Sequence, residues 1–335
     1  MIEINKYSVI KLIIFFGLFA VACSQAEPTI YFTSDRDDNL DIYSVGIDTK
    51  EQRNLTQSGS DEFGPLLSPD GRLVAFLSEN QGNIHVEVIE SDANLNESTR
   101  YKVASAEGIQ SHRWSPDSKR IAYVAVNRQV GNVYVTDVND NKTMFLTGLE
   151  ADEVGSWSRN GKSIVFAVHA GPKQGIYIRN PDGVNEFRLT EYPDFSPVWS
   201  PNGRNIAFIS TRDDSPEIYM MDAEGKDLQR LTNNTVIESS ISWSPDGQRI
   251  LFVSGLGNES EIYTVRTDKS SEGRTPVRLT HNEVMEDQPV WSPAGDKIAF
   301  VSYLDGDAEI FFMSHDGKDQ VRLTDNEFED TDPTW

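Results

Sequence analysis

The chain has 335 residues, of which 38% are hydrophobic and 10% aromatic, which is enough to bury a large core. Its 53 acidic and 30 basic residues give a formal net charge of −23, which argues against nucleic acid and anionic lipid surfaces as partners, because phosphate binding needs a basic patch. Cations, basic proteins or a simply solvated acidic surface remain open.

The chain begins with the pattern of a secretory signal peptide. Lys6 and Lys11 form a basic segment, and the apolar stretch that follows, residues 12–19, is too short to span a bilayer. We therefore expect residues 1–22 to lie outside the fold. Cys23 comes next, and as the only cysteine it cannot form an internal disulfide.

The residues around Cys23, Phe19-Ala-Val-Ala-Cys23, resemble a bacterial lipobox. The resemblance implies a lipoprotein signal peptide over residues 1–22, lipidation of Cys23 and a lipidated tether over residues 23–28. Ser24 after the cysteine favours the outer membrane by the same resemblance. We expect a lipid-anchored cell-envelope protein, on the periplasmic face or the cell surface, that touches the membrane only through its anchor. The alternative is an ordinary signal peptide with an incidental cysteine.

One short sequence motif recurs through the rest of the chain. The four copies that match the motif most fully are Trp114-Ser-Pro-Asp117, Trp199-Ser-Pro-Asn-Gly203, Trp243-Ser-Pro-Asp-Gly247 and Trp291-Ser-Pro-Ala-Gly295. Looser copies start at Leu67 and Trp157, and Trp335 is the seventh anchor. Successive anchors are 47, 43, 42, 44, 48 and 44 residues apart. A period in the forties with strand-like segments inside it predicts the blades of a β-propeller.

Each unit contains four predicted strands. The anchor ends the first strand, and Ser-Pro-Asp-Gly suits a type I turn into a second strand that is apolar on both faces, such as Ile250–Ser254. A third strand carries a pair such as Ile262-Tyr263, and a fourth ends in Leu-Thr, as at Leu279. Four strands make one blade.

The two ends of the repeat region set the number of blades. The first strand-like segment, Ile30–Ser34, has no anchor before it, and the last, Asp332–Trp335, has no second strand after it. Pairing of the two would complete one blade and remove free sheet edges. We predict an all-β, seven-bladed β-propeller of four-stranded blades over residues 29–335, closed by its C-terminal and N-terminal strands, with six blades as the alternative. We expect a monomer.

The repeats resemble the WD-like repeat of the TolB propeller family, over residues 29–335 and in seven copies. The resemblance implies the propeller fold, and it implies little about activity, because propellers host unrelated functions. TolB itself carries an α/β domain before its propeller, and the family uses that region to contact other Tol proteins. Here only Ser24–Pro28 separate Cys23 from the first predicted strand, so the likeness is to the propeller alone.

The sequence contains no familiar catalytic motif: no Gly-x-Ser-x-Gly elbow, phosphate-binding glycine loop or His-Glu-x-x-His helix. Oligogalacturonate lyases use a related propeller with a histidine-bound metal, but the five histidines here do not share one repeat position. We predict no catalytic residue, no metal ligand and no cofactor, with a divalent cation left open. His112, two residues before its anchor, is the one candidate for the central channel.

Carboxylates precede the first strand of every unit. The loops that carry them open on one face of a propeller, so we expect a negative ring at the channel mouth that attracts cations or basic segments and whose neutralisation leaves folding nearly intact. The structural alternative is that these carboxylates bond backbone amides or pair with Arg36 and Arg212. The candidates for partner binding are Asp61, Glu107, Asp152, Asp194, Glu238, Glu286 and Asp330.

Three loops are rich in aspartate, but none has the ligand spacing of a calcium loop, so we expect hairpin turns there: Asp35–Asp38, Arg212–Asp214 and Asp305–Asp307.

These patterns favour a non-enzymatic cell-envelope scaffold whose acidic channel-mouth face docks a protein or peptide, basic in character. The alternative is a propeller enzyme or glycan binder that acts on polysaccharide through the channel, with His112 and nearby carboxylates as acid–base or metal groups. Histidines and carboxylates that converge in the channel would favour the second function, and an acidic rim would favour the first.

Overall fold

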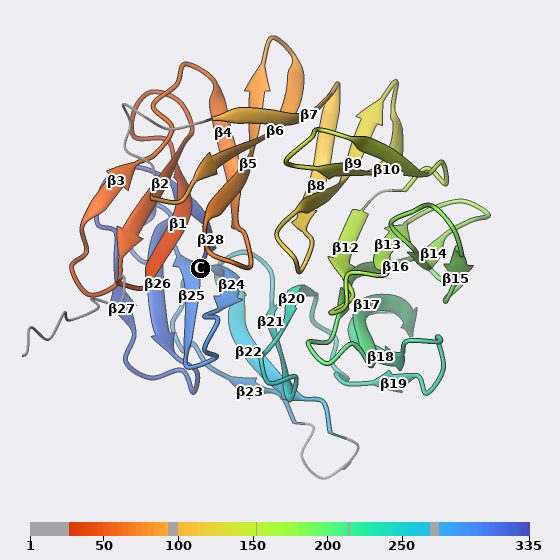
Figure 1. The fold of residues 1–335 in the computed structure, drawn as a ribbon. Coiled ribbons are helices and arrows are strands. Elements are labelled where there is room, and N and C mark those ends of the chain that lie inside the picture. Colours follow the sequence, from red (N-terminus) through yellow and green to blue (C-terminus); the bar gives the residue numbers. More distant parts are fainter. Residues whose placement is uncertain (1–26, 93–99, 152, 214, 269–274) are drawn as a thin grey trace, which may run out of the picture.

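The computed structural model describes residues 27–335 except 93–99, 152, 214 and 269–274. Seven antiparallel sheets of four strands each stand around a central axis (Figure 1). The predicted seven-bladed, all-β propeller is confirmed, and the six-bladed alternative is wrong. No helix among the described residues is long and apolar enough to cross a membrane. The predicted signal peptide and Cys23 lie outside the described residues.

The blades are numbered here in chain order, and in each the innermost strand is the one that ends at the anchor. Blade 1 consists of β28 (Asp330–Thr334), β1 (Thr29–Ser34), β2 (Asp41–Gly46) and β3 (Gln52–Asn54). Blade 2 consists of β4 (Asp61–Leu67), β5 (Leu73–Asn80), β6 (Asn83–Glu90) and β7 (Tyr101–Ala106). Blade 3 consists of β8 (Gly108–Trp114), β9 (Arg120–Asn127), β10 (Val130–Asp137) and β11 (Thr143–Thr147). Blade 4 consists of β12 (Glu153–Trp157), β13 (Ile164–Val168), β14 (Gly175–Arg179) and β15 (Phe187–Arg188).

The last three blades have the same order. Blade 5 consists of β16 (Asp194–Trp199), β17 (Asn205–Asp213), β18 (Ser215–Asp222) and β19 (Gln229–Arg230). Blade 6 consists of β20 (Glu238–Trp243), β21 (Arg249–Ser254), β22 (Glu261–Arg266) and β23 (Val277–Arg278), with the short 3-10 helix η1 (Gly257–Glu259) between β21 and β22. Blade 7 consists of β24 (Glu286–Trp291), β25 (Lys297–Ser302), β26 (Glu309–Ser314) and β27 (Val321–Arg322).

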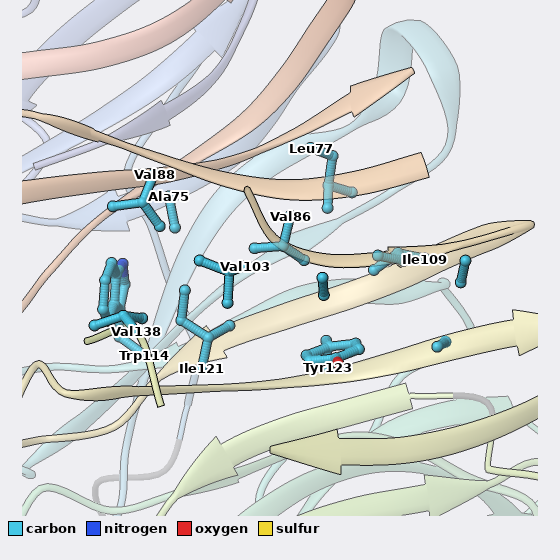
Figure 2. Packing of buried hydrophobic residues seen from close by; sticks show 13 residues of the cluster. Ala75, Leu77, Val86, Val88, Val103, Ile109, Trp114, Ile121, Tyr123 and Val138 are labelled. Carbon is cyan, nitrogen blue, oxygen red and sulfur yellow. The ribbon is translucent and has the colours of Figure 1, made fainter. Parts of the chain in front are cut away.

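The core lies between neighbouring blades. The second strand of each blade is apolar on both faces because both faces meet another sheet. In six blades this strand contributes a phenylalanine that is at most 1% exposed: Phe32, Phe76, Phe166, Phe208, Phe252 and Phe300. Figure 2 shows one such interface, where Leu77 and Val86 of blade 2 face Ile121 and Tyr123 of blade 3. Burial of each large side chain is worth about 1.5–3 kcal/mol.

The anchor tryptophans also join consecutive blades by hydrogen bonds. The indole Nε1 of Trp114 donates to the carbonyl oxygen of Leu66 at 2.9 Å, and that of Trp157 donates to Arg113 at 3.1 Å. Trp243 and Trp335 reach the preceding blade in the same way. The equivalent atoms of Trp199 and Trp291 are buried with no partner among the described residues.

The Ser-Pro-Asp-Gly phrase forms the predicted turn. In blade 2, Ser68 Oγ donates to Asp70 at 2.7 Å and accepts the amide of Leu73 at 3.0 Å. Gly71 has a φ of +75°, which favours glycine, and its amide donates to the Ser68 carbonyl at 2.8 Å. The same contacts recur at Ser115, Ser158, Ser200 and Ser244.

The ring closes within blade 1. Strand β28 pairs antiparallel with β1, with Thr334 opposite Tyr31 and Asp330 opposite Ser34. In Figure 1 the blue C-terminal strand lies beside the red N-terminal strands. The predicted closure by the last and first strands is therefore confirmed.

Candidate functional site: the central cavity and the channel-mouth face

A cavity of about 680 Å³ lies where the innermost strands meet. Its wall comes from β4, β8, β12, β20, β24 and β28, together with Leu77 and His169 of second strands or the loops after them. Each innermost strand departs from regular pairing by a bulge or register shift. In five blades the residue three positions before the anchor has a positive φ: Gly64, Ser196, Ser240, Gln288 and Asp332.

His112 lines this cavity, as its position before the anchor predicts. Only 4% of the residue is exposed, and Nε2 has no hydrogen-bond partner among the described residues. Burial, and next the charge of Arg113, lower the pKa of His112 to about 3. The imidazole is therefore neutral at physiological pH. A general acid or base works best with a pKa near the working pH, so His112 suits binding better than proton transfer.

Arg113, next in β8, also lines the cavity. Its Nε donates to the carbonyl oxygen of Gly155 at 2.9 Å and its Nη1 to that of His112 at 2.8 Å. Burial lowers the pKa of Arg113, and the charge of Glu153 partly offsets this effect. The sequence analysis did not single out Arg113, because its repeat position carries no shared residue type.

Three further titratable side chains line the cavity: His169, Glu153 and Asp332. His169 Nε2 lies 3.6 Å from Glu153, which also accepts the Ser196 amide at 2.9 Å. Asp332 accepts hydrogen bonds from Gln288 and Thr33 at 3.0 and 3.1 Å. Two histidines and two carboxylates therefore share one cavity, although the scatter of histidines along the sequence did not predict it. Among the described residues, no three His, Cys, Asp or Glu side chains are placed to hold a metal ion.

A carboxylate does recur at one repeat position, five residues before the anchor. The described examples are at most 2% exposed: Glu62, Asp194, Glu238, Glu286 and Asp330. Asp152 holds this position in blade 4 and lies outside the described residues. The expected open rim is wrong for Asp194, Glu238, Glu286 and Asp330, since their side chains point into the blades. The sequence alone allowed both arrangements, because burial depends on the neighbouring loops.

Three of these carboxylates have arginine partners. Asp194 lies 3.0 Å from Arg212, Asp330 lies 2.8 Å from Arg36, and Glu62 lies 2.5 Å from Arg100. The structural alternative of pairing with Arg36 and Arg212 is thus confirmed for Asp330 and Asp194. These carboxylates tie the start of the innermost strand to another strand or loop of the same blade.

Glu238 and Glu286 have no arginine partner within 4.0 Å among the described residues. Glu238 accepts hydrogen bonds from Thr232, Asn234 and the amide of Ile218. Glu286 accepts hydrogen bonds from Asn282 and Ser302. Burial raises the pKa of each carboxyl to about 7.

Asp61 and Glu107 occupy other repeat positions. Both are exposed, and each accepts a backbone amide from the loop between the second and third strands: Leu40 donates to Asp61 at 3.1 Å, and Arg128 donates to Glu107 at 2.6 Å. The position five before the anchor is Glu62 in blade 2 and Ile109 in blade 3. The candidate ring thus mixes two sets of carboxylates, one exposed and one buried.

The Asp-rich loops form hydrogen-bonded turns. Asp37 accepts from Tyr43 and Asn54, Asp213 accepts from Tyr219, and Asp305 pairs with Arg322. These contacts give Asp37, Asp213 and Asp305 each a partner within its own blade.

Exposed apolar side chains gather on the channel-mouth face, which we define as the face formed by the loops before the innermost strands and those between the second and third strands. The two sets of loops touch: the Gly255 amide donates to Ile237 at 3.0 Å and the Tyr303 amide to Met285 at 3.1 Å. Six residues there are 41–75% exposed: Tyr192, Val236, Ile237, Leu256, Leu304 and Phe328. Sequence reasoning missed them, although Tyr192, Val236 and Phe328 all stand two residues before a buried carboxylate.

The repeat is that of a known family. A family model described as the TolB beta propeller domain matches residues 18–195 and 190–335. The chain belongs to the TolB β-propeller domain family. The predicted resemblance to this family is confirmed.

Other proteins share parts of this TolB-like chain or its fold. An uncharacterized protein of Agrobacterium fabrum is 31% identical over 104 residues, which are 28% of this chain and 35% of that protein. This chain therefore matches about a third of that relative's length. The TolB structure from Acinetobacter baumannii has a TM-score of 0.60 at 19% identity, over 88% of this chain and 78% of that one.

Two enzyme structures also share the fold. An oligogalacturonate lyase in complex with manganese has a TM-score of 0.68 at 17% identity, over 85% of both chains. The β-propeller domain of the trilobed protease from Pyrococcus furiosus has a TM-score of 0.67 at 17% identity, over 89% of this chain and 94% of that one. At these identities the likeness shows a common fold and no common activity.

Proposed function

We propose that this TolB-like propeller is a non-enzymatic cell-envelope scaffold that docks a protein or peptide on its channel-mouth face. The exposed apolar side chains on this face carry the proposal, because the rim carboxylates expected from the sequence are mostly buried. The convergence of two histidines with Glu153 and Asp332 in the central cavity is the observation that favours the alternative, a glycan binder or enzyme that acts through the channel. A soluble protein rarely gathers large apolar side chains on one exposed surface unless that surface binds something. Tyr192, Val236 and Phe328 belong to three blades, so together they outline a broad contact surface.

The charge of the same loops indicates a basic partner. Exposed carboxylates lie next to the apolar residues, and examples are Glu259, Glu283, Asp305, Asp325, Glu327 and Glu329. Arg212, near the end of β17, pairs with buried Asp194, so its charge is already neutralised within the blade. A segment with lysine or arginine beside apolar residues complements this surface, and opposite charges also speed association.

The proposed location rests on the N-terminal sequence. Cys23 would carry the lipid anchor in the outer membrane, and the propeller would act as a monomer held at the membrane by that anchor alone. Palmitate labelling should disappear in Cys23→Ser, and persistent labelling would contradict the anchor.

Site-specific photocrosslinking in cells tests the docking surface. A crosslinker at Val236 or Phe328 should trap one protein repeatedly. One at Phe145 or Phe187, which lie on outer strands and are more exposed at 57%, should not. A double variant, Val236→Ser with Phe328→Ser, should weaken binding of the purified partner at least about tenfold, and added salt should weaken it further. Equal trapping from both pairs of positions would contradict the proposal.

A further inference from the structure

Arg113 differs from the other arginines near the innermost strands. Arg36, Arg100 and Arg212 lie 2.8, 2.5 and 3.0 Å from a buried carboxylate. In contrast, no carboxylate oxygen of the described residues lies within 4.0 Å of Arg113. Arginine stays protonated in proteins, so Arg113 holds a buried positive charge that Glu153 offsets only from a distance, without direct contact. A buried charge without a counter-ion in contact destabilises the folded protein, and a bound anion would offset this destabilisation.

The guanidinium also has free hydrogen-bonding capacity. The bonds of Arg113 to Gly155 and His112 use Nε and Nη1. Nη2 donates to no atom of the described residues. Because Arg113 lines the cavity, this nitrogen can serve a molecule bound there.

The opposite wall contributes another polar atom without a partner. Ser242 Oγ, like His112 Nε2, is buried and has no hydrogen-bond partner among the described residues. The two residues lie on β20 and β8, which belong to blades three places apart in a ring of seven. They therefore line opposite sides of the cavity. Buried polar groups are normally hydrogen-bonded, so both are available to a ligand or to water.

We propose that the central cavity binds a small monocarboxylate that also carries hydroxyl groups. Its carboxylate accepts hydrogen bonds from Arg113, and its hydroxyl groups reach His112 and Ser242. The volume of about 680 Å³ is in the range of small-molecule sites. Glu153 and Asp332 also line the cavity and add negative charge, so they disfavour a dianion such as phosphate. This site lies inside the channel and is independent of the docking surface on the channel-mouth face.

Thermal unfolding of the whole protein tests the proposal. The probes are acetate, glycolate and gluconate, each compared with its neutral amide at equal ionic strength. A ligand that binds only the folded state raises the Tm, and we expect a shift of about 3 °C or more from at least gluconate. The amides should give no shift. Absence of a shift from all three carboxylates would overturn the proposal.

Two variants locate the effect. Arg113→Gln should abolish the carboxylate-dependent shift. Arg120→Gln should keep it, because the Arg120 guanidinium stacks over Trp157 outside the cavity. Equal shifts in both variants would contradict the site. A crystal of the unaltered protein soaked in gluconate covers the case in which Arg113→Gln fails to fold: the carboxyl group should lie against Arg113, and a cavity that holds water only would overturn the proposal.

Discussion

The carboxylates five residues before the anchors share a position and meet two different environments. Asp194 and Asp330 each face an arginine, so the buried pair is electrically neutral. Glu238 and Glu286 face hydroxyl and amide groups instead, and Glu217 and Glu261 add negative charge nearby. Their carboxyls are more readily accommodated with a proton bound.

Neutralising the two carboxyls that lack an arginine should make the protein more stable in alkali. Folding raises the pKa of Glu238 and Glu286 from 4.5 to about 7, so the folded state binds these protons more tightly than the unfolded chain. Their contribution to stability is fully present below pH 4.5 and is lost as the pH rises through 7. Glu238→Gln with Glu286→Gln should raise the free energy of unfolding at pH 8 by about 1–3 kcal/mol and change it little at pH 4.5. Urea unfolding at both pH values is the measurement, and a loss of stability at pH 8 would contradict it.

Breaking a paired carboxylate should have the opposite effect. Arg212→Ala leaves Asp194, which is 0% exposed, as a buried charge without its partner. It also removes the stacking of the guanidinium over Tyr192 and Tyr219, at 4.8 Å from each ring centre. We expect a loss of about 3–5 kcal/mol at pH 8, measured by urea unfolding. A loss below about 1 kcal/mol would place this pair with ordinary surface ion pairs.

At the scale of strands and turns, the anchor tryptophans differ in one hydrogen bond. Trp114 donates to Leu66 of the preceding blade, whereas the Trp291 nitrogen has no partner among the described residues. Both residues are 8–9% exposed, so substitution by phenylalanine removes a similar amount of packing. Trp114→Phe should therefore cost about 1 kcal/mol more than Trp291→Phe, because it also removes the bond. Equal losses in thermal unfolding would show that the indole nitrogen contributes nothing.

The elements themselves could be predicted because the repeat combines three local signals. Three features recur at the same spacing: a turn motif such as Ser-Pro-Asp-Gly, an apolar second strand and a closing Leu-Thr. Each of them has a local physical cause. The outer strands are shorter than the pattern indicates, and β19 and β23 have two residues each. Their edges face solvent, so little packing extends them.

The site could be predicted only in part. His112 was placed correctly because its distance from the anchor is fixed. Asp61 and Glu107 were assigned by counting from the start of a strand. The position five residues before the anchor holds Glu62 in blade 2 and Ile109 in blade 3, so neither candidate occupies it. Arg113 and Ser242 could not be predicted as cavity residues. The cavity is lined by residues of different blades, and the repeat pattern does not identify residues at a position whose residue type varies from blade to blade.

For the whole molecule, closure through blade 1 implies a strong dependence on the last few residues. Removal of Asp332–Trp335 deletes most of β28 and the hydrogen bond from Trp335 to Val290 at 3.2 Å. Loss of a fully buried aromatic side chain costs about 3–5 kcal/mol, and Trp335 is partly buried, so its packing contributes less than this and adds to the lost strand pairing. The truncated chain should unfold at a clearly lower temperature in calorimetry, with Trp335→Phe falling between it and the unaltered protein. Unchanged unfolding of the truncated chain would contradict closure by β28.

Because Tyr31 and Thr334 are paired across two strands, the ends of the ring lie side by side, and a short glycine–serine linker could join them. New ends could then be cut elsewhere by circular permutation. A cut inside a blade, in the Pro245-Asp246 turn, would keep one sheet built from both ends of the chain. A cut between blades, at Asn233-Asn234, would leave every sheet contiguous and the ring held by side chains alone. We expect the second permutant to unfold faster in stopped-flow experiments, although both contain the same residues. Equal unfolding rates would mean that the side-chain contacts between blades are sufficient to hold the ring closed. The sheet shared by the two ends of the chain would then add no kinetic stability.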